Sequence, residues 1–300
     1  MKILLAGARG QLGSELAGQL EAAGFGVRGC GSETLDITDR KRVFEEVRAL
    51  RPGVIANCGA YTRVDLAERE RERAFAVNRD GPANLAEAAR EAGAVLVHIS
   101  TDFVFDGLKS TPYTEADPPN PLGVYGESKL AGEREIMERL EDYMIIRTSW
   151  LYGGNGQNFV KTILRHAAER EFLNVVYDQA GTPTWAADLA GALVGIIKGI
   201  GQGANEYGIY NYSNEGVASW YDFAEAILDE ARPMGFRLKC RAVRPILTAE
   251  YPAPARRPAY SVLDKGRIKK TFGADIPHWR ASLRKMLCQI APGKKEGALA

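Results

Sequence analysis

Residues 3–13 read Ile-Leu-Leu-Ala-Gly-Ala-Arg-Gly-Gln-Leu-Gly, and this stretch decides the fold. Its apolar first half predicts a β-strand, and leucines then recur at every fourth position, as on one face of a helix. Between strand and helix lies a GxxGxxG pattern made of Gly7, Gly10 and Gly13. Glycine permits a tight turn, lets a pyrophosphate approach the main chain and lets the helix pack closely on the sheet. The stretch therefore predicts a dinucleotide-binding turn; a plain glycine-rich turn is the alternative.

Outward from this turn, the first half of the chain alternates short apolar runs with helical periodicity. Further strands are expected at 27–30, 54–57, 96–99 and 143–147. Helices are expected between them, one capped by Thr38, one ended by Gly93 and one over 125–140. Strands that alternate with helices pair in parallel, and strands apolar on both faces need helices on both faces. The predicted fold class is α/β, a doubly wound parallel sheet of the Rossmann type.

After about residue 150 the apolar pattern loosens, and loops rich in glycine and proline separate the predicted helices. Three helices are expected near 158–170, 184–199 and 219–231. We expect an NAD(P)-binding domain over 1–147, with later segments returning to its sheet. A smaller α/β substrate domain is expected mainly over 148–290, and a flexible tail over 291–300.

Composition narrows the class of protein. Hydrophobic residues make up 45% of the 300 residues, charged residues 26%, and the net charge is +1. Without a basic stripe, a nucleic acid partner is not indicated. No apolar run is long enough to span a bilayer, and no signal peptide precedes the first strand. The four cysteines lack CxxC spacing, which favours free thiols in a reducing compartment. We therefore expect a cytoplasmic enzyme without a membrane partner.

Two features of the nucleotide-binding region bear on the choice of cofactor. Arg9 adds a cation to the glycine-rich turn, where it could pair with a ribose 2′-phosphate. The second strand ends without the acidic residue that would bind a free 2′-hydroxyl, and Asp36 follows only later. Both features favour NADPH, with NADH still possible. A solvated loop cation is the alternative role of Arg9.

A tyrosine and a lysine, Tyr125 and Lys129, lie four residues apart at the start of a predicted helix. They share one helix face, and Thr101 follows the fourth strand at the carboxyl edge where ligands bind. A tyrosine with an ordinary pKa near 10 is a poor acid at neutral pH. An ammonium about 4 Å away supplies the ~4 kcal/mol needed to lower that pKa by about three units. We therefore predict Tyr125 as general acid and Thr101 as a hydrogen-bond donor to substrate. Lys129 is predicted to lower the pKa of Tyr125 and to hold the nicotinamide ribose, so Tyr125 and Lys129 are also predicted cofactor-binding residues. An exposed tyrosine and a surface lysine are the alternative.

These motifs resemble the extended short-chain dehydrogenase/reductase family, and the resemblance covers nearly the whole chain. The segments that carry it are 2–7, 64–68, 100–105, 125–133, 147–150 and 178–184. The resemblance implies that a hydride passes from NAD(P)H to C4 of dTDP-4-dehydro-L-rhamnose, giving dTDP-L-rhamnose. It therefore implies a nucleotide-sugar substrate.

The resemblance also implies roles for particular residues. Beside the catalytic set Tyr125, Lys129 and Thr101, it assigns cofactor contacts to Gly10, Gln11, Leu12, Asp36, Ile37, Ala60, Tyr61 and Thr62. It assigns sugar contacts to Asp102 and Trp150; turn capping and core packing are their alternatives. Arg257 could bind the nucleotide diphosphate or lie in a surface loop.

A metal is doubtful in this chain. Some members of the family hold magnesium between acidic side chains at a dimer interface, and Glu15 lies at a matching position. The C-terminal tail offers no acidic cluster that matches, and the three histidines lack zinc spacing. We therefore expect no metal, and a homodimer is possible.

Two other functions compete with this interpretation. A different sugar-nucleotide reductase or an epimerase could use the same scaffold, and an epimerase would return the hydride. A related chain could also be a non-catalytic regulatory subunit of methionine adenosyltransferase. The intact set of Thr101, Tyr125 and Lys129 argues against a purely regulatory role.

Overall fold

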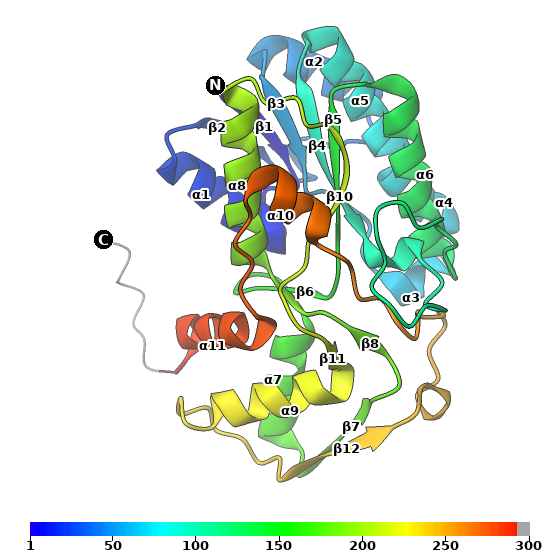
Figure 1. Cartoon of the computed structure of the whole chain (residues 1–300), viewed down its shortest axis with the longest axis vertical. Coiled ribbons are helices and arrows are strands. Elements are labelled where there is room, and N and C mark those ends of the chain that lie inside the picture. The colour runs from blue at the N-terminus through cyan, green and yellow to red at the C-terminus, as the bar shows by residue number, and fades with distance from the viewer. Residues whose placement is uncertain (293–300) are drawn as a thin grey trace.

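A parallel sheet of six strands organises the computed structural model, which describes residues 1–292 (Figure 1). The strand order is β10-β5-β4-β3-β1-β2, and every neighbouring pair is parallel. The strands are β1 (Lys2–Ala6), β2 (Gly26–Cys30), β3 (Val54–Asn57), β4 (Val95–Thr101), β5 (Tyr143–Thr148) and β10 (Gly208–Asn211). The predicted doubly wound α/β fold is confirmed, and β10 is a late segment that returns to the sheet.

Helices cover both faces of the sheet because its strands are apolar on both faces. Ile3 and Leu5 pack beneath one helical layer, whereas Leu4 and Ala6 pack beneath the other. The first layer contains α1 (Gln11–Ala22) and α8 (Ala186–Gly201). The second layer contains α2 (Arg40–Leu50), α5 (Gly81–Ala92) and α6 (Val124–Arg139).

The predicted end of α5 is confirmed, whereas the residue predicted to cap the start of α2 is not the one that caps it. Gly93 ends α5 with a φ of 64°, a left-handed conformation that glycine adopts without strain. The prediction that Thr38 caps α2 is wrong. Asp39 is the cap, because its carboxylate accepts the main-chain N–H of Arg42 at 3.1 Å. Thr38 instead donates its hydroxyl to Asp36.

The segment between β3 and α5 supports the helix that carries the predicted catalytic residues. It contains α3 (Val64–Ala67), α4 (Arg71–Phe75) and the π-helical turn η1 (Ala76–Asp80). In η1 the buried Asn78 accepts the N–H of Tyr61 at 2.8 Å and donates to Ser128 Oγ at 3.0 Å. A Cβ at Gly132 would lie 2.0 Å from the Asn78 carbonyl oxygen, so glycine allows α6 to contact η1 directly. This packing fixes the first turns of α6.

The remaining elements build a second, smaller core, formed by buried residues between Tyr152 and Leu287. Three short strand pairs lie there: β6 (Leu151–Tyr152) with β9 (Thr184–Trp185), β7 (Phe172–Val176) with β12 (Ala242–Ile246), and β8 (Ala180–Gly181) with β11 (Ala218–Ser219). The helices of the later half, besides α8, are α7 (Phe159–Glu169), α9 (Trp220–Ala231), α10 (Gly266–Phe272) and α11 (Trp279–Ile290). Two short 3-10 turns complete the fold: η2 (Asp102–Val104) follows β4, and η3 (Thr248–Glu250) follows β12. The division near residue 147 stays a prediction, because the core of the sheet also includes Leu189, Tyr210 and Ile268 from the later half. The predicted tail lies outside the described residues from 293 onward.

Candidate active site

The glycine-rich turn between β1 and α1 is built for a phosphate group. Gly7 has a φ of 74°, and a Cβ there would lie 2.5 Å from the Gly59 nitrogen. A Cβ at Gly13 would lie 2.1 Å from the Gly7 carbonyl oxygen. Gly10 is the N-cap of α1 and offers no side-chain acceptor, so the N–H groups of the first turn are free for an anion. These features fit the pyrophosphate of a dinucleotide.

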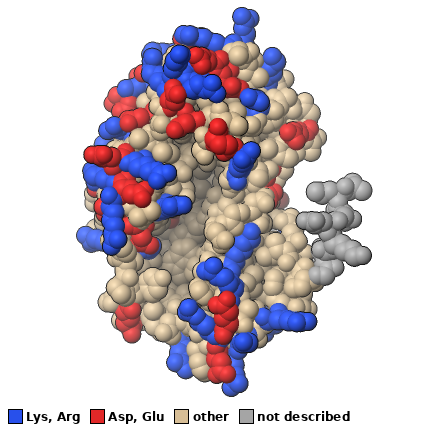
Figure 2. Space-filling view, turned by 180° about the vertical axis from the view of Figure 1, so that it is seen from behind, with Lys and Arg blue, Asp and Glu red and all other residues tan. Residues whose placement is uncertain are grey.

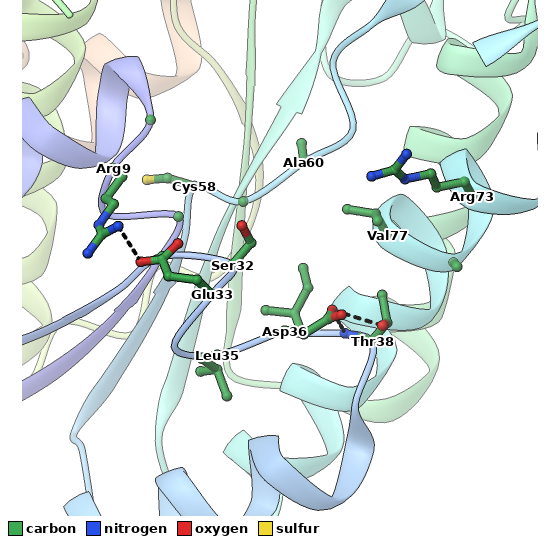
Figure 3. A pocket seen from close by; sticks show the side chains of 16 residues that line it. Arg9, Ser32, Glu33, Leu35, Asp36, Thr38, Cys58, Ala60, Arg73 and Val77 are labelled. Carbon is green, nitrogen blue, oxygen red and sulfur yellow. Dashed lines mark hydrogen bonds and ion pairs between the residues drawn. The ribbon is translucent and has the colours of Figure 1, made fainter. Parts of the chain in front are cut away.

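A cavity of about 440 Å³ opens beside this turn, at the carboxyl ends of β1, β2 and β3 (Figure 3). Of the predicted cofactor residues, it is lined by Gly7, Arg9, Gly10, Asp36, Ile37 and Ala60. The other predicted residues of the turn and of the segment after β3 lie outside its lining. Leu12 is buried in the core, Gly13 packs on the turn, and Gln11 accepts a hydrogen bond from Asn158. Tyr61 donates its hydroxyl to Glu70, and Thr62 is exposed. The cavity therefore contains part of the predicted set.

Arg9 does not stand alone in this cavity. Its guanidinium pairs with the carboxylate of Glu33 at 2.8 Å, as the dashed line in Figure 3 shows. A Cβ at Gly31 would lie 2.4 Å from Glu33 Oε1, so this carboxylate occupies the space where a side chain directly after β2 would begin. Glu33 was not among the predicted site residues, because it lies in the turn after β2 and not in the strand itself. The part of the cavity next to the glycine-rich turn thus pairs a carboxylate, Glu33, with a cation, Arg9.

Tyr125 and Thr101 meet at the carboxyl end of β4. The Thr101 side chain lies close enough to the Tyr125 hydroxyl to influence its pKa, and the rings of Phe103 and Tyr125 pack edge to face with centroids 5.5 Å apart. A Cβ at Gly126 would lie 2.2 Å from the Phe103 carbonyl oxygen, which explains how α6 begins so close to η2. Desolvation raises the pKa of Tyr125 to about 12, and Thr101 only partly opposes this rise.

Lys129 lies one helical turn further along α6 and is buried. Its ammonium donates to the carbonyl oxygen of Ile99 at 2.6 Å and lies 3.2 Å from Nε2 of His98. Burial lowers the pKa of Lys129 to about 8, although the charge of Glu133 acts in the opposite direction. We expected Lys129 to lower the pKa of Tyr125. This role stays a prediction: the ammonium donates to the Ile99 main-chain carbonyl, and burial is the largest influence on the pKa of the tyrosine.

Of the predicted substrate residues, Asp102 contacts this centre directly. Asp102 is buried and accepts from the Thr101 hydroxyl at 3.1 Å, and desolvation raises its pKa to about 6. Trp150 has a φ of 46° and stacks on Trp220 with ring centroids 3.5 Å apart. Arg257 pairs with Asp65 at 2.8 Å.

Arg257 and Trp220 also line a second, larger cavity of about 1,030 Å³. Cationic side chains outnumber acidic ones in its lining, which includes three arginines, Arg170, Arg256 and Arg257, and a single carboxylate, Asp65. The molecule is hollowed on the face shown in Figure 2, and Lys and Arg side chains lie beside the hollow. A cavity with this lining suits an anionic ligand with an aromatic portion.

A buried ion pair that was not among the predicted site residues joins Glu133 and Arg147, near the predicted catalytic residues. Glu133 of α6 accepts two hydrogen bonds from Arg147 of β5, at 2.6 and 3.0 Å, and one from Ser100 at 2.5 Å. Its signal in the sequence was an arginine that ends an otherwise apolar strand. The pair joins α6 to the sheet directly below the catalytic helix turn.

Residues 1–292 contain neither a membrane-spanning helix nor a cluster of metal-ligating side chains. No helix in this range is long and apolar enough to cross a bilayer. Within the same residues, no group of three or more His, Cys, Asp or Glu side chains could hold a metal ion. All four cysteines are free thiols.

The parallel sheet, the glycine-rich turn and the Tyr–Lys pair beside β4 define the class: an NAD(P)H-dependent oxidoreductase of the extended short-chain dehydrogenase/reductase type. The chain belongs to the RmlD substrate binding domain family, whose model matches residues 1–291.

Comparison with individual proteins agrees with this membership. A dTDP-4-dehydrorhamnose reductase of Aggregatibacter actinomycetemcomitans is 44% identical over 285 residues, which is 94% of this chain and 97% of that protein. A solved dTDP-4-dehydrorhamnose reductase of Clostridium acetobutylicum is 40% identical, with a TM-score of 0.90 and coverage of 97% and 99%. That of Bacillus anthracis, solved in complex with NADP, is 38% identical with a TM-score of 0.90, over 96% and 99%.

Proposed function

We propose that this chain reduces the C4 keto group of dTDP-4-dehydro-L-rhamnose to give dTDP-L-rhamnose. The observation that carries the proposal is the meeting of Thr101 and Tyr125 at the carboxyl end of β4. Polar contacts run from Lys129 through His98 and Asn57 to Gly59, which lines the dinucleotide cavity. The full-length similarity to reductases that act on this sugar agrees with the proposal.

The residues of the chain divide the work of the reaction. The dihydronicotinamide, when bound, supplies the hydride. Tyr125 donates its proton to the C4 oxygen, and the Thr101 hydroxyl holds that oxygen in place. The Lys129 ammonium favours the phenolate that Tyr125 leaves behind and binds the nicotinamide ribose. Asp102 and Trp150 orient the sugar, and Arg257 binds the diphosphate.

For the cofactor, the proposal is that NADPH is preferred and NADH is also accepted. Arg9 is 75% exposed at its side chain and can turn from Glu33 towards a 2′-phosphate. Glu33 can accept a hydrogen bond from a free 2′-hydroxyl, as an acid beside the second strand does in this fold. The NADP complex of the Bacillus anthracis relative agrees with the phosphate-binding role.

The test supplies dTDP-4-dehydro-L-rhamnose with NADPH and then NADH, and follows the loss of cofactor absorbance. Turnover is expected with both and should fall at least ~100-fold in Tyr125→Phe, the lower end of what general acid catalysis contributes. Circular dichroism of the variant checks that its fold is intact. Near-normal turnover in Tyr125→Phe would refute the assigned acid.

The alternatives give different results in the same assay. An epimerase would convert a nucleotide sugar without net consumption of NAD(P)H. A regulatory subunit would show no turnover and would co-purify with a methionine adenosyltransferase. A homodimer stays a prediction, which light scattering of the purified chain tests.

A further inference from the structure

His98 connects the active site to the interior of the sheet. It lies on β4 and is fully buried, between the end of β3 and α6. Its Nδ1 is 3.0 Å from the amide nitrogen of Asn57, and its Nε2 is 3.2 Å from Nζ of Lys129. The three side chains therefore form a continuous chain of polar contacts that ends at a proposed catalytic group.

The orientation of the Asn57 amide fixes the direction of the hydrogen bonds in this series of contacts. The main-chain N–H of Gly59 donates to Oδ1 of Asn57 at 3.0 Å. A main-chain N–H can only donate, so this oxygen faces Gly59 and the amide NH2 group faces His98. The amide nitrogen then donates to Nδ1, which must carry no proton. A neutral imidazole in this position holds its proton on Nε2.

The protonation state of the imidazole follows from the same contacts. An imidazolium would carry a proton on Nδ1, directed at the amide N–H groups of Asn57. Burial and the charge of Lys129 both lower the pKa of His98 well below its usual value. His98 therefore stays neutral and directs its Nε2–H at Lys129.

The Nε2–H of His98, directed at Lys129, interacts differently with the neutral amine and with the ammonium of that lysine. The lone pair of a neutral amine accepts a hydrogen bond from Nε2–H, whereas an ammonium has only donors and meets it unfavourably. The Ile99 carbonyl accepts from Lys129 in either form. We propose that Asn57 and His98 are positioning residues that hold one imidazole tautomer and so favour the neutral amine of Lys129.

The consequence is that Lys129 gives up its proton closer to neutral pH than an ordinary lysine does. The other charged or titratable groups that act on Lys129 are Cys58, beyond β3, and Glu133, one turn along α6 and paired with Arg147. Both raise the pKa of Lys129, so His98 and burial oppose them. The importance of this for catalysis rests on the proposed role of Lys129, but the tautomer of His98 does not.

The first test reads the tautomer directly and needs neither substrate nor a variant with altered activity. The chain has three histidines, so the imidazoles labelled with ¹⁵N give few signals by NMR. The signal of His98 is the one that disappears in His98→Gln. Throughout the pH range in which the protein is folded, Nδ1 should be unprotonated and Nε2 protonated. A protonated Nδ1, in either the neutral or the charged ring, overturns the proposal.

Two substitutions test the link to Lys129. In His98→Gln the side-chain amide can turn its oxygen towards the ammonium, without any change of charge. The alkaline limb of kcat/KM should then move upward by about one pH unit, the equivalent of one typical hydrogen bond. In Asn57→Asp the second carboxylate oxygen accepts instead of donating, so the His98 proton should move to Nδ1 in the NMR spectrum. Either an unmoved limb or an unchanged tautomer counts against the proposal.

His278→Gln is the matched control, because His278 caps α11 and is exposed. It should leave the alkaline limb in place. The NMR measurements determine the tautomer of His98 even if the protein has no reductase activity. A wrong tautomer and a wrong proposed function would therefore give different results.

Discussion

Glu133 of α6 and Arg147 of β5 form an ion pair whose side chains are 0% and 2% exposed. Removing one member of such a pair leaves an uncompensated charge in the interior. Glu133→Gln should therefore lower the free energy of unfolding by about 3–5 kcal/mol, measured by chemical denaturation. Glu91→Gln, which breaks the exposed pair with Arg48, should leave stability nearly unchanged, because solvent screens exposed charges. Equal effects of the two substitutions would contradict this account.

The pair between Arg9 and Glu33 leads to a prediction about cofactor preference. Arg9→Ala should lower kcat/KM for NADPH by about 10- to 100-fold, the value of a hydrogen bond to a charged group, and leave NADH nearly unchanged. Glu33→Gln should act in the opposite direction, because it weakens the contact with a 2′-hydroxyl and removes a charge that repels a phosphate. Kd values from fluorescence titration check both changes independently of turnover.

Arg73→Ala is the control for this prediction, because Arg73 lines the same cavity on another side, as Figure 3 shows. It should affect the two cofactors similarly. If Arg9→Ala also affects NADPH and NADH similarly, Arg9 does not bind the 2′-phosphate.

The buried carboxyl of Asp102 makes stability depend on pH. Burial raises its pKa to about 6 in the folded protein from 3.8, so between these values the unfolded chain has lost its proton while the folded chain keeps it. Stability therefore falls as pH rises from about 4 to about 6, by roughly 3 kcal/mol. Asp102→Asn should remove this loss, so the variant should be the more stable protein at pH 7 and similar at pH 4.

Thermal unfolding of the wild-type protein and of Asp102→Asn at pH 4 and pH 7 measures this effect. Asp102→Asn should also bind the sugar more weakly. A parallel loss of stability in both proteins between pH 4 and 6 would show that another group is responsible.

The sequence predicted those features that depend on local pattern. Apolar runs and the glycine spacing gave the sheet and the phosphate-binding turn, since both follow from residues adjacent in the chain. The Tyr125–Lys129 pair was visible because helical spacing places the two on one face. Glu33 and His98 were missed as site residues, because their roles depend on how loop and strand side chains meet across β2, β3 and β4. Register and loop conformation, rather than spacing, decide such contacts.

Arg257 provides the last prediction, since it lines the large cavity and is paired with Asp65. If it binds the diphosphate of the sugar nucleotide, Arg257→Gln should raise the KM for the substrate by about 10- to 100-fold, with kcat and cofactor Kd nearly unchanged. Arg244→Gln is the control, because Arg244 stacks on Phe172 and lies outside the cavity lining. A decrease in kcat at unchanged KM would instead place Arg257 in the chemical step, whereas no effect would mean that its role ends with the Asp65 pair.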